Sequence, residues 1–466
     1  MTQLTPQLRY LPNVQQQALW LENVSIQQLA SQVATPFYCY SKAALLNNIH
    51  ACKAAFEPEN IHIHYAMKAN SNLSLLRIVA EQGLGVDIVS IGEMRRALSA
   101  GFKAEDIVFS GVGKTTAELT EAVLAGVGQF NLESKEELAV LITIADKYQQ
   151  LVSALIRVNP EVTVDTHKHI TTGAKGNKFG VNFSDVLPML ETAEYSPFLK
   201  INGLAMHIGS QIRTTQPYLD AIAKIQRLIN ELKTQGYLLT QLDLGGGFGI
   251  EYKDYQQLTH NIEQQGQGCL AFSDFSNAIK SALAHWQGRI SIEPGRSLMA
   301  DIGVMVCEIT YIKESRPTSF IVLDAAMNDL MRPALYQETH ALIPVQSPSS
   351  SLQTKYDVVG PICESTDTFS KSASLPTDLA AGDLMCFLYT GAYCAVMSNS
   401  YNSRPIAAEI LVDDAQAYVI RQAITQDDLM AFEQHRTLIR TIPKQSVEVN
   451  IILSATRPRS PDKTQP

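Results

Sequence analysis

The chain has 466 residues, of which 45% are hydrophobic and 18% charged, a composition typical of globular proteins and unlike that of disordered, collagenous or coiled-coil chains. Its formal net charge of −9, from 37 Lys plus Arg against 46 Asp plus Glu, provides no basic surface for nucleic acid or for an anionic membrane. We therefore expect a small-molecule partner, no nucleic acid and no membrane.

Cysteine usage and the N-terminus predict a cytoplasmic protein. The seven cysteines stand singly, with no CxxC pair, which is typical of a reducing compartment and disfavours structural zinc. The first thirty residues lack a basic start followed by an apolar run. His62 with His64, and His167 with His169, have a spacing that resembles metal ligation, but no carboxylate or cysteine completes such a site. We expect no metal.

Eight short apolar or alternating runs predict β-strands, at 61–67, 85–90, 107–111, 129–134, 154–160, 203–209, 241–247 and 291–295. Helical spacing of apolar residues separates them, as at 74–82, 93–101 and 219–236. Eight β/α alternations over about 240 residues predict a (β/α)8 TIM barrel, hence an α/β protein. An open doubly wound sheet is the alternative, although that fold does not require eight units.

After residue 296 the chain predicts strands with little helix between them, at 320–327, 356–364, 383–393 and 409–422. This pattern predicts a C-terminal all-β domain of sandwich or barrel type. We expect an N-terminal segment at 1–41 that joins the β-domain through a strand at 35–40. The barrel then occupies 42–298, the β-domain 299–457, and a disordered, proline-containing tail 458–466.

Catalytic groups of a (β/α)8 barrel lie at the C-terminal ends of its strands. Here those ends deliver a lysine, a histidine, a glutamate, a glycine run and an arginine, a set suited to binding an anionic cofactor and forming an imine. Lys68 follows a buried strand, so we expect apolar surroundings to lower its pKa and free the amine. The residues at these ends are Lys68, Asp87, Ser90, Asn159, His207, Ser210, Gly245, Gly246, Gly247, Glu293, Gly295 and Arg296.

The glycine run 245–249 predicts an anion site when it is combined with Gly295 and Arg296 at the next strand end. Barrels often bind phosphate after their seventh and eighth strands. The run is not a dinucleotide fingerprint, because Ile250 stands where the last glycine would be. Glu293 is either a buried carboxylate paired with an arginine or the partner of a pyridine nitrogen.

Eight motifs in order resemble those of the diaminopimelate decarboxylase family: HYAMKAN, GVDIVSIGE, HIGSQI, LDLGGGFGI, EPGR, RPALY, GPICEST and GAYCAVMSNSYNSRP. The resemblance spans residues 35–420. It implies a fold-type III pyridoxal phosphate enzyme, with an alanine-racemase-like barrel and a C-terminal β-domain. The implied reaction is the pyridoxal-phosphate-dependent decarboxylation of meso-2,6-diaminopimelate to L-lysine and CO2, the last step of lysine biosynthesis.

The resemblance also implies a role for each matching residue at the cofactor. Lys68 would form the imine with pyridoxal 5'-phosphate, His207 would stack on the ring, and Glu293 would pair with the pyridine nitrogen. Asp87 would lie near the cofactor and orient His207. The phosphate end would be bound by Ser210, Gly245, Gly246, Gly247, Gly295 and Tyr393, and Arg296 is a further cofactor-binding residue.

The same resemblance implies how the substrate is held. Cys363 would return a proton after carbon dioxide leaves, and Glu364 would meet the distal amine. Both would reach into the neighbouring subunit's site, which implies a homodimer with shared active sites. The residues that contact the substrate would be Arg296, Arg332, Tyr336, Glu364 and Tyr393.

Two alternative functions remain open from the sequence. The first is a decarboxylase of a basic amino acid, such as ornithine, lysine, arginine or a D-amino acid, on the same scaffold. Arg332 argues for a dicarboxylic substrate because a buried arginine without an anion is costly, unless it packs or pairs elsewhere. The second is a non-catalytic homologue that binds a partner. Such a protein should lack Lys68 or Cys363, and both are present.

Overall fold

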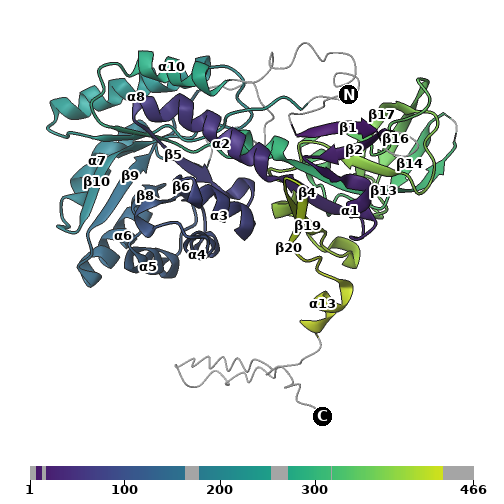
Figure 1. Cartoon of the computed structure of the whole chain (residues 1–466). Coiled ribbons are helices and arrows are strands. Elements are labelled where there is room, and N and C mark those ends of the chain that lie inside the picture. Colours follow the sequence, from purple (N-terminus) through teal and green to yellow (C-terminus); the bar gives the residue numbers. More distant parts are fainter. Residues whose placement is uncertain (1–6, 13–16, 163–177, 253–270, 316, 434–466) are drawn as a thin grey trace, which may run out of the picture. The chain divides into compact units, whose positions relative to one another are not determined.

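The structure is a computed structural model that describes residues 7–12, 17–162, 178–252, 271–315 and 317–433 (Figure 1). Described residues up to Thr425 belong to one compact unit, and those from Gln426 belong to a second that contains helix α13 (Gln426–Ala431). In these described parts, no helix is both long enough and apolar enough to cross a membrane.

The predicted barrel is confirmed: eight parallel strands close on themselves in the order β10-β11-β12-β5-β6-β7-β8-β9. The pairing of β9 with β10 has a register shift between Ile201 and Gly203, and Ile292 of the last strand pairs with Ile63 of the first, which closes the barrel. The strands are β5 (Ile61–Ala66), β6 (Gly85–Ile88), β7 (Ile107–Phe109), β8 (Gln129–Leu132), β9 (Val152–Arg157), β10 (Leu199–Ala205), β11 (Gln241–Asp243) and β12 (Arg289–Ile292).

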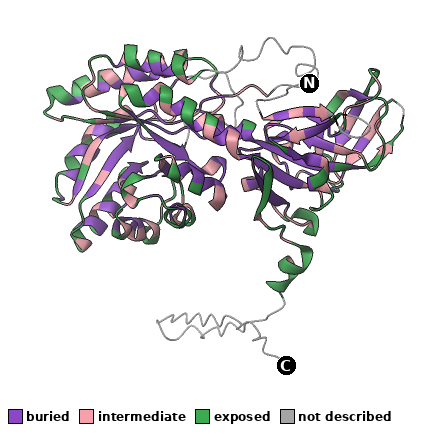
Figure 2. Cartoon of the chain, viewed as in Figure 1, coloured by how far each residue is buried: buried purple, intermediate pink, exposed green. Residues whose placement is uncertain are grey.

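Helices surround the barrel and bury one face against it, whereas their outer faces are exposed (Figure 2). Capping residues in the sequence mark where these helices begin and end. α5 begins with a capping box between Thr115 and Glu118 and ends at Gly126, whose φ of 78° suits a left-handed cap. The helices are α2 (Lys42–Phe56), α3 (Leu73–Glu81), α4 (Ile91–Ala100), α5 (Thr116–Ala125), α6 (Lys135–Tyr148), α7 (Phe183–Ala193), α8 (Gln216–Thr234) and α10 (Phe272–Ala282).

The predicted β-rich part is also confirmed, as a nine-stranded sheet with the path β17-β16-β14-β13-β4-β19-β20 and with β15 and β18 off that path. The N-terminal strand β4 (Phe37–Ser41) joins this sheet, antiparallel to β13 and parallel to β19. The other strands are β13 (Gly303–Lys313), β14 (Ser319–Leu323), β15 (Leu342–Pro344), β16 (Gln353–Val359), β17 (Thr368–Pro376), β18 (Leu384–Phe387), β19 (Ala408–Asp413) and β20 (Gln416–Arg421).

Several strand boundaries differ from the predictions. The run 409–422, predicted as one strand, is the hairpin β19/β20, with Asp414 at φ 57° in its turn. β13 and β17 were missed. β17 has the sequence TFSKSASLP, whose small polar residues weaken the strand signal. The domain boundaries stay a prediction, and the predicted tail 458–466 lies outside the described residues.

Residues of the β-rich part are hydrogen-bonded to the segment that carries Lys68. The backbone N–H of Tyr393 donates to the carbonyl oxygen of Ala69 at 2.8 Å. The side-chain amide of Asn70 donates to the carbonyl oxygen of Gly391 at 2.9 Å. The loop after β18 is thereby fixed beside the end of β5, and side chains of the sheet can reach the mouth of the barrel.

A short β-hairpin with a third strand precedes the sheet. β1 (Leu8–Pro12), β2 (Gln17–Leu21) and β3 (Val24–Ser25) form it, and α1 (Ile26–Ala30) follows. Two further short helices bear on the site, α11 (Arg296–Met299) and α12 (Arg332–Tyr336).

Candidate active site

Lys68 lies at the mouth of the barrel in the short 3-10 turn η2 (Met67–Ala69), directly after β5. Its Nζ donates to Oδ2 of Asp87, at the end of β6, at 2.8 Å. The lysine side chain is 33% exposed, whereas the Asp87 side chain is wholly buried. The other oxygen of Asp87, Oδ1, is buried without a hydrogen-bond partner.

The expectation that burial lowers the pKa of Lys68 is wrong in its net direction. Burial lowers the pKa, but the carboxylates of Asp87 and Glu293 raise it by more, together with Tyr393, so it lies above its ordinary value. The sequence showed that Lys68 ends a buried strand. It did not show that two acidic groups from other strands face the amine.

Glu293 follows β12 and is 6% exposed. Burial raises its pKa well above the usual range, and the nearby carboxylates of Asp243 and Asp87 raise it further. Its Oε1 is buried without a hydrogen-bond partner. An unpartnered buried carboxyl oxygen is costly, so this atom is available to a donor that enters the site.

His207 follows β10 and accepts a hydrogen bond at Nδ1 from the backbone N–H of Gly246, at 3.2 Å. Burial lowers its pKa well below the ordinary value, and the positive charges of Lys68 and Arg157 lower it further. The ring is therefore neutral near pH 7. The expectation that Asp87 orients His207 stays a prediction.

The glycine run forms a turn that only glycine fits. A Cβ on Gly246 would lie 2.0 Å from the carbonyl oxygen of Glu293, and one on Gly247 would lie 2.2 Å from that of Gly209. Gly245 and Gly247 also have positive φ, at 68° and 101°. The absence of side chains lets three strand ends approach one another.

Arg296 contacts several residues on the side of the predicted site that is expected to bind phosphate. It donates to Oγ of Ser210 at 2.9 Å and to the hydroxyl of Tyr252 at 2.7 Å. Its guanidinium lies 4.6 Å from the ring centroid of Tyr393. Gly295 lies directly before it, where a Cβ would be 3.1 Å from the Cβ of Ala66. Ser210, Gly295, Arg296 and Tyr393 are thus close together.

Arg332 begins α12 and is 1% exposed. Its guanidinium donates to the hydroxyl of Tyr252 and to the carboxylate of Glu338, and it lies 3.3 Å from Nε2 of His340. Tyr252 therefore bridges Arg296 and Arg332. Tyr336, another of the predicted substrate contacts, ends the same short helix.

Cys363 and Glu364 lie in the loop between β16 and β17, and both are exposed. The backbone N–H of Cys363 lies 3.4 Å from Oδ1 of Asn402, and the hydroxyl of Tyr401 donates to Glu364 at 3.2 Å. Neither residue lines the cavity beside Lys68. Within this single chain, the structure does not bring them to the other predicted site residues that line that cavity.

A cavity of about 430 Å³ opens beside Lys68, and His207 and Glu293 also line it. Several of its residues were not predicted: Ser110, Asn131, Arg157 and Phe179. Arg157 ends β9 and pairs with Glu133 at 2.5 Å. The strand-end rule could have found it, because β9 ends at Arg157 rather than at 160 as predicted.

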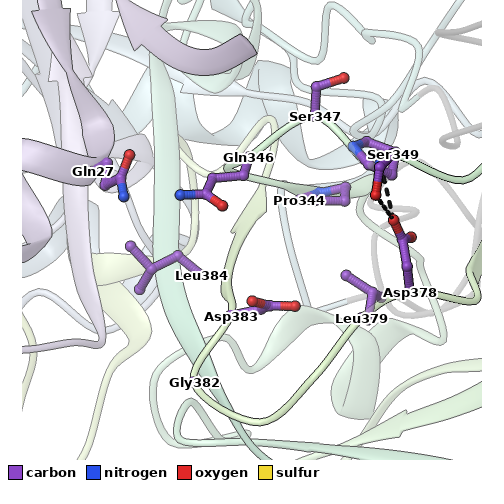
Figure 3. A pocket seen from close by; sticks show the side chains of 11 residues that line it. Gln27, Pro344, Gln346, Ser347, Ser349, Asp378, Leu379, Gly382, Asp383 and Leu384 are labelled. Carbon is purple, nitrogen blue, oxygen red and sulfur yellow. Dashed lines mark hydrogen bonds between the residues drawn. The ribbon is translucent and has the colours of Figure 1, made fainter. Parts of the chain in front are cut away.

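A second cavity, of about 290 Å³, lies on the β-rich part, and none of the predicted site residues line it (Figure 3). Its Asp378 accepts hydrogen bonds from the backbone and hydroxyl of Ser349 and from the backbone of Ser350. The carboxylate is thus already satisfied by the chain.

Within the described ranges, no group of three His, Cys, Asp or Glu side chains could hold a metal ion. His167 and His169 lie outside these ranges. His64 lies within these ranges. Burial lowers its pKa to about 3, and the nearby Arg289 and His62 also act to lower it.

Comparison with known proteins decides the family. Residues 42–300 match the model of the pyridoxal-dependent decarboxylases, pyridoxal binding domain. The diaminopimelate decarboxylase of Zymomonas mobilis is 39% identical over 420 residues, which is 89% of this chain and 96% of that protein. The chain belongs to the diaminopimelate decarboxylase family. It is therefore a carboxy-lyase, and its cofactor is pyridoxal phosphate.

Solved members of the family share the fold. The enzyme of Helicobacter pylori, complexed with L-lysine, is 37% identical with a TM-score of 0.81, over 88% of this chain and 99% of that one. The enzyme of M. jannaschii, in co-complex with L-lysine, is 28% identical with a TM-score of 0.85, over 93% of this chain and 99% of that one.

The residues present fit this cofactor. Lys68 has a partly exposed amine beside a cavity, and Oε1 of Glu293 is buried without a hydrogen-bond donor. The Nε of Arg296 is buried without a partner, and the same guanidinium donates to Ser210. An aldehyde, a ring nitrogen and a phosphate each match one of these features.

Proposed function

We propose that the protein decarboxylates meso-2,6-diaminopimelate to L-lysine and CO2, the last step of lysine biosynthesis. The observation that supports this substrate is the burial of Arg332, which is 1% exposed. Its guanidinium donates to the hydroxyl of Tyr252, which also accepts a hydrogen bond from Arg296. A buried arginine suits a second, distal carboxylate, which a basic amino acid such as ornithine lacks. The enzyme of H. pylori is complexed with L-lysine, the product of this reaction.

The residues described above support a place for the cofactor. Lys68 would hold the aldehyde end through its amine, and Asp87 would keep that amine oriented. His207 would cover the ring as a neutral imidazole. The phosphate would be bound by Ser210, Gly295, Arg296, Tyr393 and the backbone of glycines 245–247.

Electron withdrawal is the chemistry that pyridoxal phosphate supplies when bound, since its ring accepts the electron pair of the bond that breaks at the substrate's α-carbon. Glu293 contributes by holding a proton at the ring nitrogen, because its Oε1 is otherwise without a partner. The largely buried surroundings of Glu293 and Asp87 strengthen these interactions, since less water screens them.

The proton that replaces the carboxylate comes from Cys363, and the distal amine meets Glu364. Both side chains are exposed in the single chain and are absent from the lining of the Lys68 cavity. Their exposure in the single chain supports a role at the site of a neighbouring copy. The protein is a homodimer with shared active sites, and it works in the cytoplasm, as its isolated cysteines suggest.

A second candidate is the decarboxylation of a basic amino acid without a distal carboxylate. The observation that favours it is the ion pair between Arg332 and Glu338, which gives the arginine an anion from within the chain. In that case Arg332 is a structural residue and makes no contact with the substrate.

Product analysis distinguishes the two. The holoenzyme is incubated separately with meso-diaminopimelate, ornithine, L-lysine, D-lysine and arginine, and amines are identified by mass spectrometry. We expect L-lysine from diaminopimelate and no product from the others. Arg332→Lys should reduce kcat/KM for diaminopimelate steeply, because an ammonium cannot reproduce a bidentate contact. Lys68→Ala, as a control, should lose the visible absorbance of the bound cofactor together with turnover.

A further inference from the structure

Asp243 is a buried carboxyl group at the mouth of the barrel for which the proposed mechanism has no role. It ends β11, two residues before the glycine turn, and it is 1% exposed. Its Oδ1 accepts from the backbone N–H of Gly245 at 2.9 Å. Its Oδ2 accepts from the side-chain amide of Gln129 at 3.1 Å and lies 3.5 Å from that of Asn131.

The backbone ties Asp243 to Glu293. Gly245, whose N–H binds Asp243, accepts at its carbonyl oxygen from the N–H of Glu293 at 2.9 Å. The two side-chain carboxyls lie within hydrogen-bonding reach of each other. Such a contact requires a proton on one of them, since two carboxylates offer only acceptors.

The surroundings place this proton on Glu293. Asp243 is held as the acceptor by Gly245, Gln129 and Asn131, all of which donate to it. Glu293 has no comparable side-chain donor, and its Oε1 is without a partner. The charged groups that face the pair are Asp87 and Lys68, which form an ion pair at 2.8 Å. Asp87 raises the pKa of Glu293 and Lys68 lowers it, so their effects act in opposite directions. One shared proton is the usual state of two carboxyl groups in contact.

We propose that Asp243 is a positioning residue that holds the side chain of Glu293 and fixes its proton, and so sets the protonation of the cofactor's ring nitrogen. The inference rests on the proposed function only in that it requires bound pyridoxal phosphate. The identity of the amino-acid substrate does not enter. Without Asp243, Glu293 loses both a neighbouring negative charge and a hydrogen-bond partner, and it ionises at lower pH.

The test uses the holoenzyme and the variant Asp243→Asn, which keeps the shape of the side chain. The pH titration of the bound cofactor's absorbance should move by about one unit, equivalent to roughly a tenfold change in a proton equilibrium. Asp329→Asn, which removes a buried carboxyl outside the Lys68 cavity, should leave this titration in place. An unmoved titration in Asp243→Asn would overturn the proposal.

A double-mutant cycle separates positioning from a general effect on folding. If Asp243 acts through Glu293, then adding Asp243→Asn to Glu293→Gln should change kcat by less than twofold, although each single variant lowers it on the order of tenfold or more. Multiplicative losses in kcat would show that the two residues act independently, against the proposal. KM should change little in Asp243→Asn.

A second measurement uses the cofactor-free protein, so that the proposal can still be tested if Asp243→Asn does not form the holoenzyme. The raised pKa of both carboxyls means that the free energy of unfolding of the cofactor-free protein falls as pH rises above about 4.5. Asp243→Asn should flatten this slope, whereas Gln129→Leu, which removes a donor to the Asp243 carboxylate and so raises the pKa of the pair, should make the loss of stability larger. An unchanged slope in whichever variants fold contradicts the shared proton. Failure of the wild-type chain to bind pyridoxal phosphate would instead refute the proposed function.

Discussion

Glu338 forms an ion pair with Arg332, the arginine proposed to receive the distal carboxylate of the substrate. The arginine side chain is 1% exposed and that of Glu338 is 23% exposed. A guanidinium buried to this degree requires an anion, and Glu338 supplies one when no substrate is present. The substrate's carboxylate must therefore share Arg332 with Glu338 or displace it.

Glu338→Gln should destabilise the protein by about 1–3 kcal/mol, because the buried charge of Arg332 loses its anionic partner. Meso-diaminopimelate should raise Tm more in this variant than in the wild type, since the substrate then supplies the missing carboxylate, whereas ornithine should not. Thermal unfolding with each ligand measures this. Glu105→Gln is a matched control, because Glu105 pairs with Lys103 while both are 74% exposed. Equal Tm shifts with diaminopimelate in wild type and Glu338→Gln would place Arg332 outside the substrate site.

Cys363→Ala should retain the absorbance of the bound cofactor but lower kcat on the order of a hundredfold or more, because the thiol is the proposed proton donor. Single-turnover release of CO2 should be less affected than release of lysine. A sample that mixes Cys363→Ala with Lys68→Ala subunits should regain activity if sites are shared between subunits. No recovery in mixed dimers would mean that each chain completes its own site.

Gly246→Ala should prevent cofactor binding. Its Cβ would lie 2.0 Å from the carbonyl oxygen of Glu293, so the turn and the glutamate must move apart. Loss of cofactor absorbance after dialysis is the measurement. Gly92→Ala provides a control, because the nearest atom to its Cβ would be Oγ of Ser90 at 3.7 Å, an ordinary contact. Normal cofactor affinity in Gly246→Ala would show that the turn is free to relax.

Asp329 makes stability depend on pH. Burial raises the pKa of this carboxyl to about 7, from 3.8, since the neutral form is favoured inside the protein. The resulting stability is full below pH 4 and is lost as pH rises through 7, on the order of 4 kcal/mol. Asp329→Asn should flatten the free energy of unfolding over this window. Asp378 gives the opposite sign, because hydrogen bonds from Ser349 and Ser350 lower its pKa, so its contribution is lost as pH falls. A slope unchanged by Asp329→Asn would assign the pH dependence to other groups.

The barrel could be predicted from sequence because each strand is a short apolar run and each helix carries its own end signals. β5 and α3, for example, follow the predicted ranges 61–67 and 74–82 to within a residue or two. The hairpin β19/β20 was merged into one strand because its turn contains no glycine or proline, only Asp413, Asp414 and Ala415.

The sequence alone also pointed to Lys68, His207, Glu293 and the glycine run, since each follows a strand and the rule that strand ends form the site depends only on order along the chain. Tertiary structure decided the relations among them. Asp87 and Glu293 face Lys68 from the ends of β6 and β12 and reverse the expected direction of its pKa, and Glu338 pairs with Arg332 just after the left-handed Gln337 ends α12. Electrostatic effects depend on distances through space between residues far apart in sequence, and the order of residues does not state those distances.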